Sequence, residues 1–247
     1  MMGRTWFGAL CLMLSPTLAF PEPETWRSHI NAGMVEYQRA GHAKKRRAFH
    51  QAKLHYGQAE TWLTAALREA ETFPQPDHRV SVTLNYLSWV YLGQRQYAAA
   101  EAVLRRALAI DEELAGAIGY QGSMATTLDN LKGVYFEQGR YGDAEVVAER
   151  SLELHERAFG TEHLALAKPL EHLVKIHFAQ GQYMRAELFI KRQLAIQERA
   201  LGPKHSRVGT TLENYAAILR RLNRVREAAE MEARARAIPA RRPGTLK

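Results

Sequence analysis

Ten histidines give this 247-residue chain its most obvious capacity for metal binding or acid–base chemistry. Three of them, His78, His163 and His205, stand in the tripeptides PDH, TEH and PKH, each six or seven residues before a leucine that opens a similar segment. A residue that recurs once per segment is expected to cap or pack a repeated structural unit. His172 and His177 are five residues apart, about 140° around a helix, so they cannot share a metal ion. We therefore expect the histidines to be structural and predict no metal site.

No pattern typical of an enzyme occurs elsewhere in the chain. H-E-x-x-H, G-x-S-x-G and the Walker phosphate loop are all absent. The acidic run Asp111, Glu112, Glu113 has no basic partner arranged around a cleft, so solvated charge is expected there rather than general acid–base catalysis. Cys11 is the only cysteine. The sequence thus predicts a protein that is not an enzyme, with no cofactor and no small-molecule substrate.

The first twenty residues differ in kind from the rest. Arg4 precedes an apolar stretch at 6–14, and Thr17 and Ala19 follow as small residues. This order predicts a signal peptide at 1–19, cleaved after Ala19. The alternative is an uncleaved membrane anchor, but this stretch is too short for the roughly 30 Å of bilayer hydrocarbon. Cleavage would remove the only cysteine, and the chain has no Asn-x-Ser/Thr site, so we expect an exported protein of the bacterial periplasm.

Positive charge is concentrated at the two ends of the remaining chain. Residues 39–53 carry a net charge of +6 with no acidic residue, and residues 220–247 also carry +6, whereas the segment between them is acidic. Basic ends of this kind suit anionic lipid headgroups, lipopolysaccharide or an acidic protein. The alternative is a solvated helix face and a basic tail at 239–247. Nucleic acid is not an expected partner, because no DNA- or RNA-binding motif is present.

The chain repeats itself. Four segments open alike, namely VTLNYL at 82–87, TTLDNL at 126–131, KPLEHL at 168–173 and TTLENY at 210–215. Sixteen residues after the first leucine of each segment stands an alanine: Ala100, Ala144, Ala186 and Ala228. The intervals of 44, 42 and 42 residues are typical of an array of stacked units.

Each unit has the periodicity of two helices. In the third unit, apolar residues recur at helical spacing on both sides of Gly139. Gly139 and Gly181 are expected to end the first helix of their units, because glycine accepts the positive φ of a C-terminal cap. Gly160 and Gly202 are expected to break the chain between units. Each unit is therefore predicted to be a helical hairpin, held close by its small alanine and covered by the next hairpin.

These residues resemble a tetratricopeptide repeat (TPR) array, and more narrowly the 42-residue subtype of kinesin light chains. The resemblance is carried by the L-x-N-L opening at 128–131, the G-x-Y-x-x-A-E turn at 139–145 and the GPKHS loop at 202–206. It covers about residues 56–238 and implies an all-α fold, a right-handed TPR solenoid of four to five helical hairpins.

The N-terminal part departs from the regular period. Residues 20–81 are expected to hold N-terminal helices and a first, irregular repeat, with one first helix at 28–40 and a single long second helix at 43–71, along which Phe49 and later apolar residues form one stripe. Residues 82–238 are expected to form three regular repeats and a C-terminal capping repeat, whose charged last helix faces solvent.

The resemblance also implies a binding site on the concave wall, where the family's L-x-N asparagines hold the backbone of an extended peptide. An asparagine suits this role because it both donates and accepts hydrogen bonds. Only Asn130 and Asn214 match directly, and Tyr86 and His172 occupy the corresponding places in the other units. The predicted peptide-binding residues are Asn85, Tyr86, Trp89, Asp129, Asn130, His172, Lys175 and Asn214. Further inward candidates are Phe136, Glu171 and Glu213.

Two functions are compatible with these features. The preferred one is an exported, non-catalytic protein–protein interaction scaffold that binds an extended peptide or a partner helix in the TPR groove. The alternative is an envelope-surface accessory protein whose basic ends contact anionic lipid, lipopolysaccharide or acidic proteins.

Overall fold

The computed structural model describes residues 24–118 and 123–238, and all regular structure within these ranges is helical. Ten α-helices follow one another: α1 Glu24–Lys45, α2 Phe49–Ala70, α3 His78–Gly93, α4 Tyr97–Ile118, α5 Met124–Glu137, α6 Tyr141–Phe159, α7 Ala167–Ala179, α8 Tyr183–Leu201, α9 Ser206–Arg221 and α10 Val225–Arg236. A short 3-10 helix, η1 (Leu164–Leu166), precedes α7. The predicted all-α fold is confirmed, while the expected signal peptide and the basic tail lie outside the described residues.

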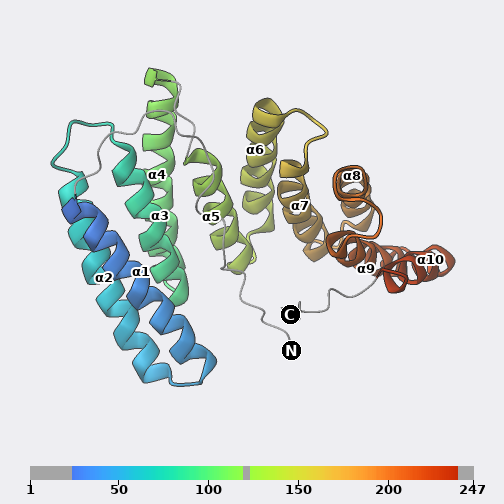
Figure 1. The fold of residues 1–247 in the computed structure, drawn as a ribbon, viewed down its shortest axis with the longest axis horizontal. Helices are drawn as coiled ribbons and strands as arrows, with labels where there is room; N and C mark the ends of the chain where they lie inside the picture. The colour runs from blue at the N-terminus through green and yellow to red at the C-terminus, as the bar shows by residue number, and fades with distance from the viewer. Residues whose placement is uncertain (1–23, 119–122, 239–247) are drawn as a thin grey trace, which may run out of the picture.

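Consecutive helices pair as five antiparallel hairpins, and the second helix of each hairpin packs against the first helix of the next. The hairpins lie in chain order across the molecule, from α1 and α2 at one end to α9 and α10 at the other (Figure 1). The five hairpins agree with the predicted solenoid. None of the described helices is long and apolar enough to span a bilayer.

The five hairpins share one type of turn. In each, one residue with a φ between 61° and 74° follows the first helix: Arg47, Arg95, Gly139, Gly181 and Asn223. The next backbone N–H donates to a carbonyl five residues earlier, from Ala48 to Ala43 at 2.9 Å in the first turn and from Arg224 to Leu219 at 2.9 Å in the last. This hydrogen bond closes a Schellman motif. The predicted roles of Gly139 and Gly181 are therefore confirmed.

The turn at Arg47 contradicts the prediction of one helix over 43–71. α1 ends at Lys45 and α2 begins at Phe49. The break is not evident in the sequence because arginine stands where the third and fourth hairpins have glycine, although left-handed backbone costs a non-glycine residue about 1–2 kcal/mol. Phe49, expected on the buried stripe, is 66 % exposed because it lies at the start of α2 rather than inside a longer helix. The second hairpin also begins earlier than residue 82, at His78.

The core follows the repeat. The four alanines of the period are 0–1 % exposed, as are the four opening leucines Leu84, Leu128, Leu170 and Leu212. Alanine at the crossing point lets the two helices of a hairpin approach closely, because a longer side chain would separate them. On α10 the described buried residue is Ala228, so this last helix faces solvent, as predicted for a cap.

Candidate peptide-binding site

The first helices of neighbouring hairpins form one continuous wall. α1 contacts α3 and α3 contacts α5, in addition to the partners within their own hairpins. Side chains also connect α3 to α5 and α5 to α7. Elements that approach each other across repeats lie on the inner side of a curved solenoid, where these proteins present their binding surfaces. The surface formed by α3, α5, α7 and α9 is called the inner wall below.

Three predicted site residues meet on this wall. The indole N–H of Trp89 donates to Oδ1 of Asn130 at 3.0 Å, and Nδ2 of Asn130 donates to Oδ1 of Asn85 at 2.7 Å. The orientation of the Asn130 amide follows from its partner, because an indole nitrogen can only donate. The Trp89 ring also makes an edge-to-face contact with Tyr86, with ring centroids 5.3 Å apart. Trp89 and Asn130 are half-buried, whereas Asn85 is buried.

The same chain of hydrogen bonds continues into the core. Nδ2 of Asn85 donates to Oγ1 of Thr127 at 2.8 Å, and that hydroxyl donates to Oδ2 of Asp111 at 2.6 Å. Ser81 and Ser123 donate to the other oxygen of Asp111. Each donor in the series thus points toward one buried carboxylate.

Asp111 corrects the expectation that residues 111–113 form a solvated acidic run. Its side chain is 1 % exposed, whereas Glu112 and Glu113 are exposed. Burial raises the pKa of Asp111, and the hydroxyl donors partly oppose that rise. Asp111 follows Leu104 and Ala107 on the buried face of α4, so helical spacing predicts its burial, while the serine and threonine partners come from other helices.

A related contact recurs two repeats later. Oγ1 of Thr211 donates to Oε1 of Gln197 at 2.7 Å. In the repeat, Thr211 corresponds to Thr127 and Gln197 corresponds to Asp111. In the intervening hairpin the threonine position holds Pro169, which has no side-chain hydroxyl. The polar connection between hairpins is therefore a property of the repeat, and it carries a full carboxylate only at Asp111.

Two other predicted residues meet at the junction of α5 and α7. Nζ of Lys132 lies 2.5 Å from Nδ1 of His172 and 3.3 Å from Oδ1 of Asp129. Oδ1 of Asp129 is 3.5 Å from Nδ1 of His172. Because an ammonium can only donate, Nδ1 of His172 is the acceptor and the ring is neutral. Lys132 was not among the predicted site residues, although it follows Asp129 by three residues and so lies on the same helix face.

The electrostatics of this junction follow from burial and from its charges. Burial lowers the pKa of Lys132 to about 8, although Asp129 opposes the effect. Burial and the Lys132 ammonium lower the pKa of His172. Burial alone would raise the pKa of Asp129, but the Lys132 ammonium holds it well below its usual range. Asp129 therefore remains ionised, and His172 resists protonation.

The remaining predicted residues lie separately along the inner wall. Nζ of Lys175 on α7 donates to Oε1 of Glu171 at 2.6 Å. Asn214 and Glu213 on α9 are exposed. Phe136 makes an edge-to-face contact with Tyr141, with ring centroids 5.2 Å apart, so it belongs partly to the interface within its own hairpin. The eight predicted residues thus follow the wall, but only two groups of them are in contact.

Two of the recurring histidines cap helices, as predicted. Nδ1 of His163 accepts from the backbone N–H of Ala165 at 3.1 Å, and Nδ1 of His205 accepts from that of Arg207 at 3.2 Å. At the start of α3 the cap is Asp77 rather than His78. Among the described residues no cluster of histidine, aspartate or glutamate has the arrangement of a metal site.

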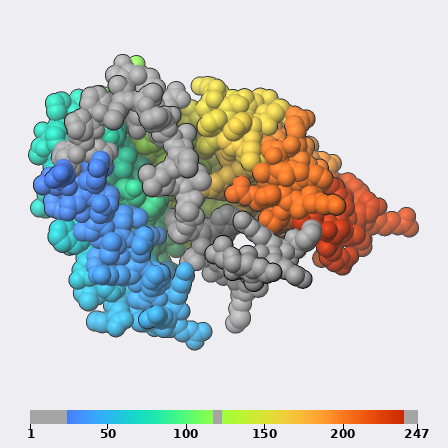
Figure 2. Space-filling model, in the orientation of Figure 1, coloured from blue at the N-terminus to red at the C-terminus, as the bar shows by residue number. Residues whose placement is uncertain are grey.

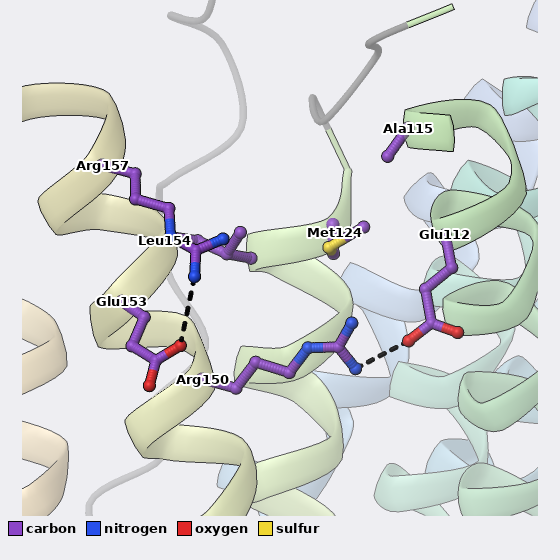
Figure 3. Close-up of a pocket in the computed structure, with 7 residues that line it drawn as sticks. All are labelled: Glu112, Ala115, Met124, Arg150, Glu153, Leu154 and Arg157. Carbon is purple, nitrogen blue, oxygen red and sulfur yellow. Dashed lines mark ion pairs between the residues drawn. The ribbon is translucent and has the colours of Figure 1, made fainter. Parts of the chain in front are cut away.

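An open hollow of about 450 Å³ lies outside the inner wall, between α4, α5 and α6 (Figure 3). Its arginines are paired, because Arg150 contacts Glu112 at 2.6 Å and Arg157 contacts Glu153 at 3.8 Å. The hollow is therefore a polar gap between hairpins with its charges already compensated.

Several solved structures share this fold. A structure of BtubC (BKLC) from P. vanneervenii superposes with a TM-score of 0.67 at 19 % identity, over 91 % of this chain and 96 % of that one. A kinesin-light-chain-like protein of Podosopora anserina with nearly identical TPR-like repeats gives 0.71 at 18 %, over 89 % and 97 %. The apo form of RapI gives 0.68 at 15 %, over 89 % and 65 %. Comparison with curated proteins gives no match.

A family model matches most of the chain. The model for the tetratricopeptide repeat matches residues 48–113, 123–192 and 167–240, which together include four of the five hairpins and the second helix of the first. Proteins built from these repeats generally act as interaction scaffolds. The chain is a member of the tetratricopeptide repeat family.

Proposed function

We propose that this protein is an exported, non-catalytic scaffold whose inner wall binds an extended peptide segment of a partner protein. The observation that carries the proposal is the fixed orientation of Asn130. Its side-chain oxygen accepts from Trp89 and its nitrogen donates to Asn85. A carboxamide has two N–H donors and two acceptor sites, so one of each remains on Asn130 for a ligand.

A peptide backbone offers one N–H and one C=O per residue, which matches this remaining capacity. Because the amide is already held by two neighbours, a ligand would not bear the entropic cost of ordering it. Asn214, two repeats further along in the same register, is exposed on α9. The two amides would contact main chain at separate points, with little dependence on the ligand's side chains.

Selectivity would come from the groups around these amides. Trp89 and Tyr86 offer aromatic surface next to Asn130. Further along, the wall alternates charges of both signs, with Lys132 beside Asp129 and Lys175 beside Glu171. A wall with compensated charges favours a ligand of mixed charge over a purely acidic or purely basic one.

The open space beside Gly133 on α5 allows the site to be blocked by a larger side chain, without removing the residues that stabilise it. Gly133 follows Asn130 by three residues, and a Cβ atom added there would meet nothing within 4 Å. Gly142, on the second helix α6, has the same open surroundings. Leucine at either place is a good helix former, so neither change should harm the fold.

The test is a binding selection with a random-sequence peptide library displayed on phage. Peptides selected on the wild-type protein are measured against the Gly133→Leu and Gly142→Leu variants by fluorescence anisotropy. We expect Gly133→Leu to weaken binding at least about tenfold, because the leucine would occupy the space beside Asn130, and Gly142→Leu to leave it unchanged. Peptides that bind both variants and the wild type equally would contradict the proposed site.

Salt provides an independent check on the mechanism. Binding through neutral amides should persist between low and moderate ionic strength, whereas binding through the basic ends should weaken strongly over the same range. Asn214→Ala, at an exposed position, should weaken the same peptides with little effect on stability. A peptide that is lost at moderate salt and bound normally by Asn214→Ala would indicate a charged surface instead of the inner wall.

Export rests on the first nineteen residues of the sequence, with their basic residue, short apolar core and small residues before the expected cleavage point. Mass spectrometry of the protein from fractionated bacterial cells tests it. We expect a periplasmic chain that begins at Phe20. An intact chain in the cytoplasmic fraction would overturn this part of the proposal and leave the peptide-binding part standing.

A further inference from the structure

We propose that the tip of the first hairpin, residues 44–54, docks on an anionic lipid bilayer. The tip comprises the last residues of α1, the turn at Arg47 and the first two turns of α2. It stands at the lower edge of the molecule in Figures 1 and 2, beyond the ends of α3 and α4.

The charge of the tip is positive and uncompensated. Five cations are exposed there: Lys44, Lys45, Arg46, Arg47 and Lys53. The described residues supply no ion pair to any of the five. Arg39, one turn earlier, already pairs with Glu36 at 2.5 Å and is not part of the tip. A compact group of exposed cations near the end of one element is the pattern that attracts the negative surface potential of a membrane.

The basic residues before α2 do not stabilise the helix that they precede, so folding does not explain why they are there. The N-terminal end of a helix carries partial positive charge and favours acidic residues. The first turn of α2 has none, and Arg46 and Arg47 stand directly before it. Arg47 also holds a φ of 61°, which is unfavourable for arginine, as does Arg95 at the same turn of the second hairpin. Residues that oppose local stability are expected where function needs them.

Apolar side chains are exposed among these cations. Phe49 is 66 % exposed and Leu54 is 58 % exposed. Lys44, Phe49 and Lys53 also line a hollow of about 320 Å³ at the base of the tip, next to Tyr56. Exposed aromatic and aliphatic groups surrounded by basic residues are typical of surfaces that insert into the headgroup region of a bilayer.

A bilayer fits these features better than other anionic partners. Nucleic acid would be held by the cations but would leave Phe49 and Leu54 in water. A projecting tip presents its cations and apolar groups together to a flat surface, whereas a peptide ligand is held in a concave groove. The tip lies on the first hairpin, apart from the inner-wall amides of Asn130 and Asn214, so membrane docking and peptide binding do not compete for the same residues.

The test is co-sedimentation with large unilamellar vesicles of phosphatidylcholine alone or with about 30 % phosphatidylglycerol, an anionic lipid that gives the surface the negative potential to which basic segments are attracted. The protein is purified from cells that express the complete chain. The tip variant is Lys44→Gln, Lys45→Gln, Arg46→Gln, Arg47→Asn, in which asparagine tolerates the positive φ. The matched control, Lys204→Gln, Arg207→Gln, Arg226→Gln, Arg236→Gln, removes four exposed cations near the other end.

We expect wild type and control to bind the anionic vesicles and not the neutral ones, and the tip variant to bind them on the order of a hundredfold more weakly. Phe49→Ala alone should weaken binding about tenfold, because one inserted ring is lost while the charge stays. Circular dichroism should show equal helicity in all four proteins.

Three outcomes would overturn the proposal. An equal loss of vesicle binding in the tip variant and the control would show that binding depends on net charge and not on the tip. A loss of vesicle binding only in the control would show that α9 and α10, and not the tip, contact the bilayer. Binding of a duplex oligonucleotide by the tip, with no preference for anionic over neutral vesicles, would identify nucleic acid as the partner.

Discussion

The indole N–H of Trp89 on α3 and the Oδ1 atom of Asn130 on α5 lie 3.0 Å apart and join two hairpins through residues 41 positions apart. Asn130 in turn donates to Asn85, Asn85 donates to Thr127, and Thr127 donates to Asp111. The residue that the proposed function assigns to ligand contact therefore also holds the second and third hairpins in register. This double role decides which substitutions test structure and which test binding.

Asn130→Ala should destabilise the protein, because it removes the acceptor of the Trp89 N–H and the donor to the Asn85 oxygen. The free energy of unfolding should fall by about 1–3 kcal/mol, the usual cost of partly buried groups left unpaired. Urea denaturation followed by circular dichroism measures it. Asn214→Ala, the same substitution at an exposed residue of α9, is the matched control and should stay within about 0.5 kcal/mol of wild type. Equal losses in the two variants would show that the hydrogen-bond chain does not contribute to stability.

Asp111→Ala should be more damaging still. It removes the acceptor of the Ser81, Ser123 and Thr127 hydroxyls and leaves a cavity on the buried face of α4. We expect a loss of about 3 kcal/mol in the free energy of unfolding. Asp111→Asn should lose less, because it keeps one oxygen acceptor and removes a buried charge. Glu112→Ala breaks only an exposed pair with Arg150 and should cost at most about 0.5 kcal/mol.

His172 should make stability depend on pH. Its pKa is lower in the folded protein than in the unfolded chain, so the unfolded chain binds more protons as the pH falls through about 6.5. The free energy of unfolding should therefore decrease below that pH, by up to about 1.4 kcal/mol at pH 5.5. Asp129 stays ionised over this range, since its pKa is lowered well beyond it.

Urea denaturation at pH 7.5 and pH 5.5 measures the effect, and His172→Gln should reduce the difference between the two values because glutamine does not titrate. An unchanged difference in His172→Gln would assign the pH dependence to other groups.

Alanine substitutions at two glycines of one hairpin should change the stability of the protein in opposite directions. Gly139 has a φ of 73°, so Gly139→Ala should destabilise by about 1 kcal/mol through backbone strain alone, since an added Cβ meets nothing within 4 Å. Gly133 lies inside α5 with equally open surroundings, so Gly133→Ala should stabilise by about 0.5–1 kcal/mol. Thermal denaturation of both variants provides the comparison. A stabilised Gly139→Ala would show that the turn can relax to another backbone conformation.

The hairpins could be predicted from the sequence because their determinants are local. Helical spacing of apolar residues, an alanine at the crossing point and a glycine at the turn each act within about twenty residues, and the period repeats them. Gly139, Gly181 and the buried alanines were therefore assigned correctly. Arg47 was not, because its positive φ is imposed by the packing of α1 on α2 and not by its own preference.

The inner wall was only partly predictable. Repeat register placed Asn130, His172 and Asn214 on the first helices, but it could not show that Asn130 binds Trp89 and Asn85, or that Lys132 and Asp129 meet His172. The sequence also predicted that Asp111 is solvent-exposed, whereas the structure buries it. These contacts join side chains some 40 positions apart, so they depend on how far one hairpin is rotated and shifted against the next. Sequence alone determined that this chain forms stacked hairpins with an inner wall. Only the tertiary structure decided which polar groups of that wall pair between hairpins and which stay exposed, because burial and pairing depend on the stacking of whole hairpins.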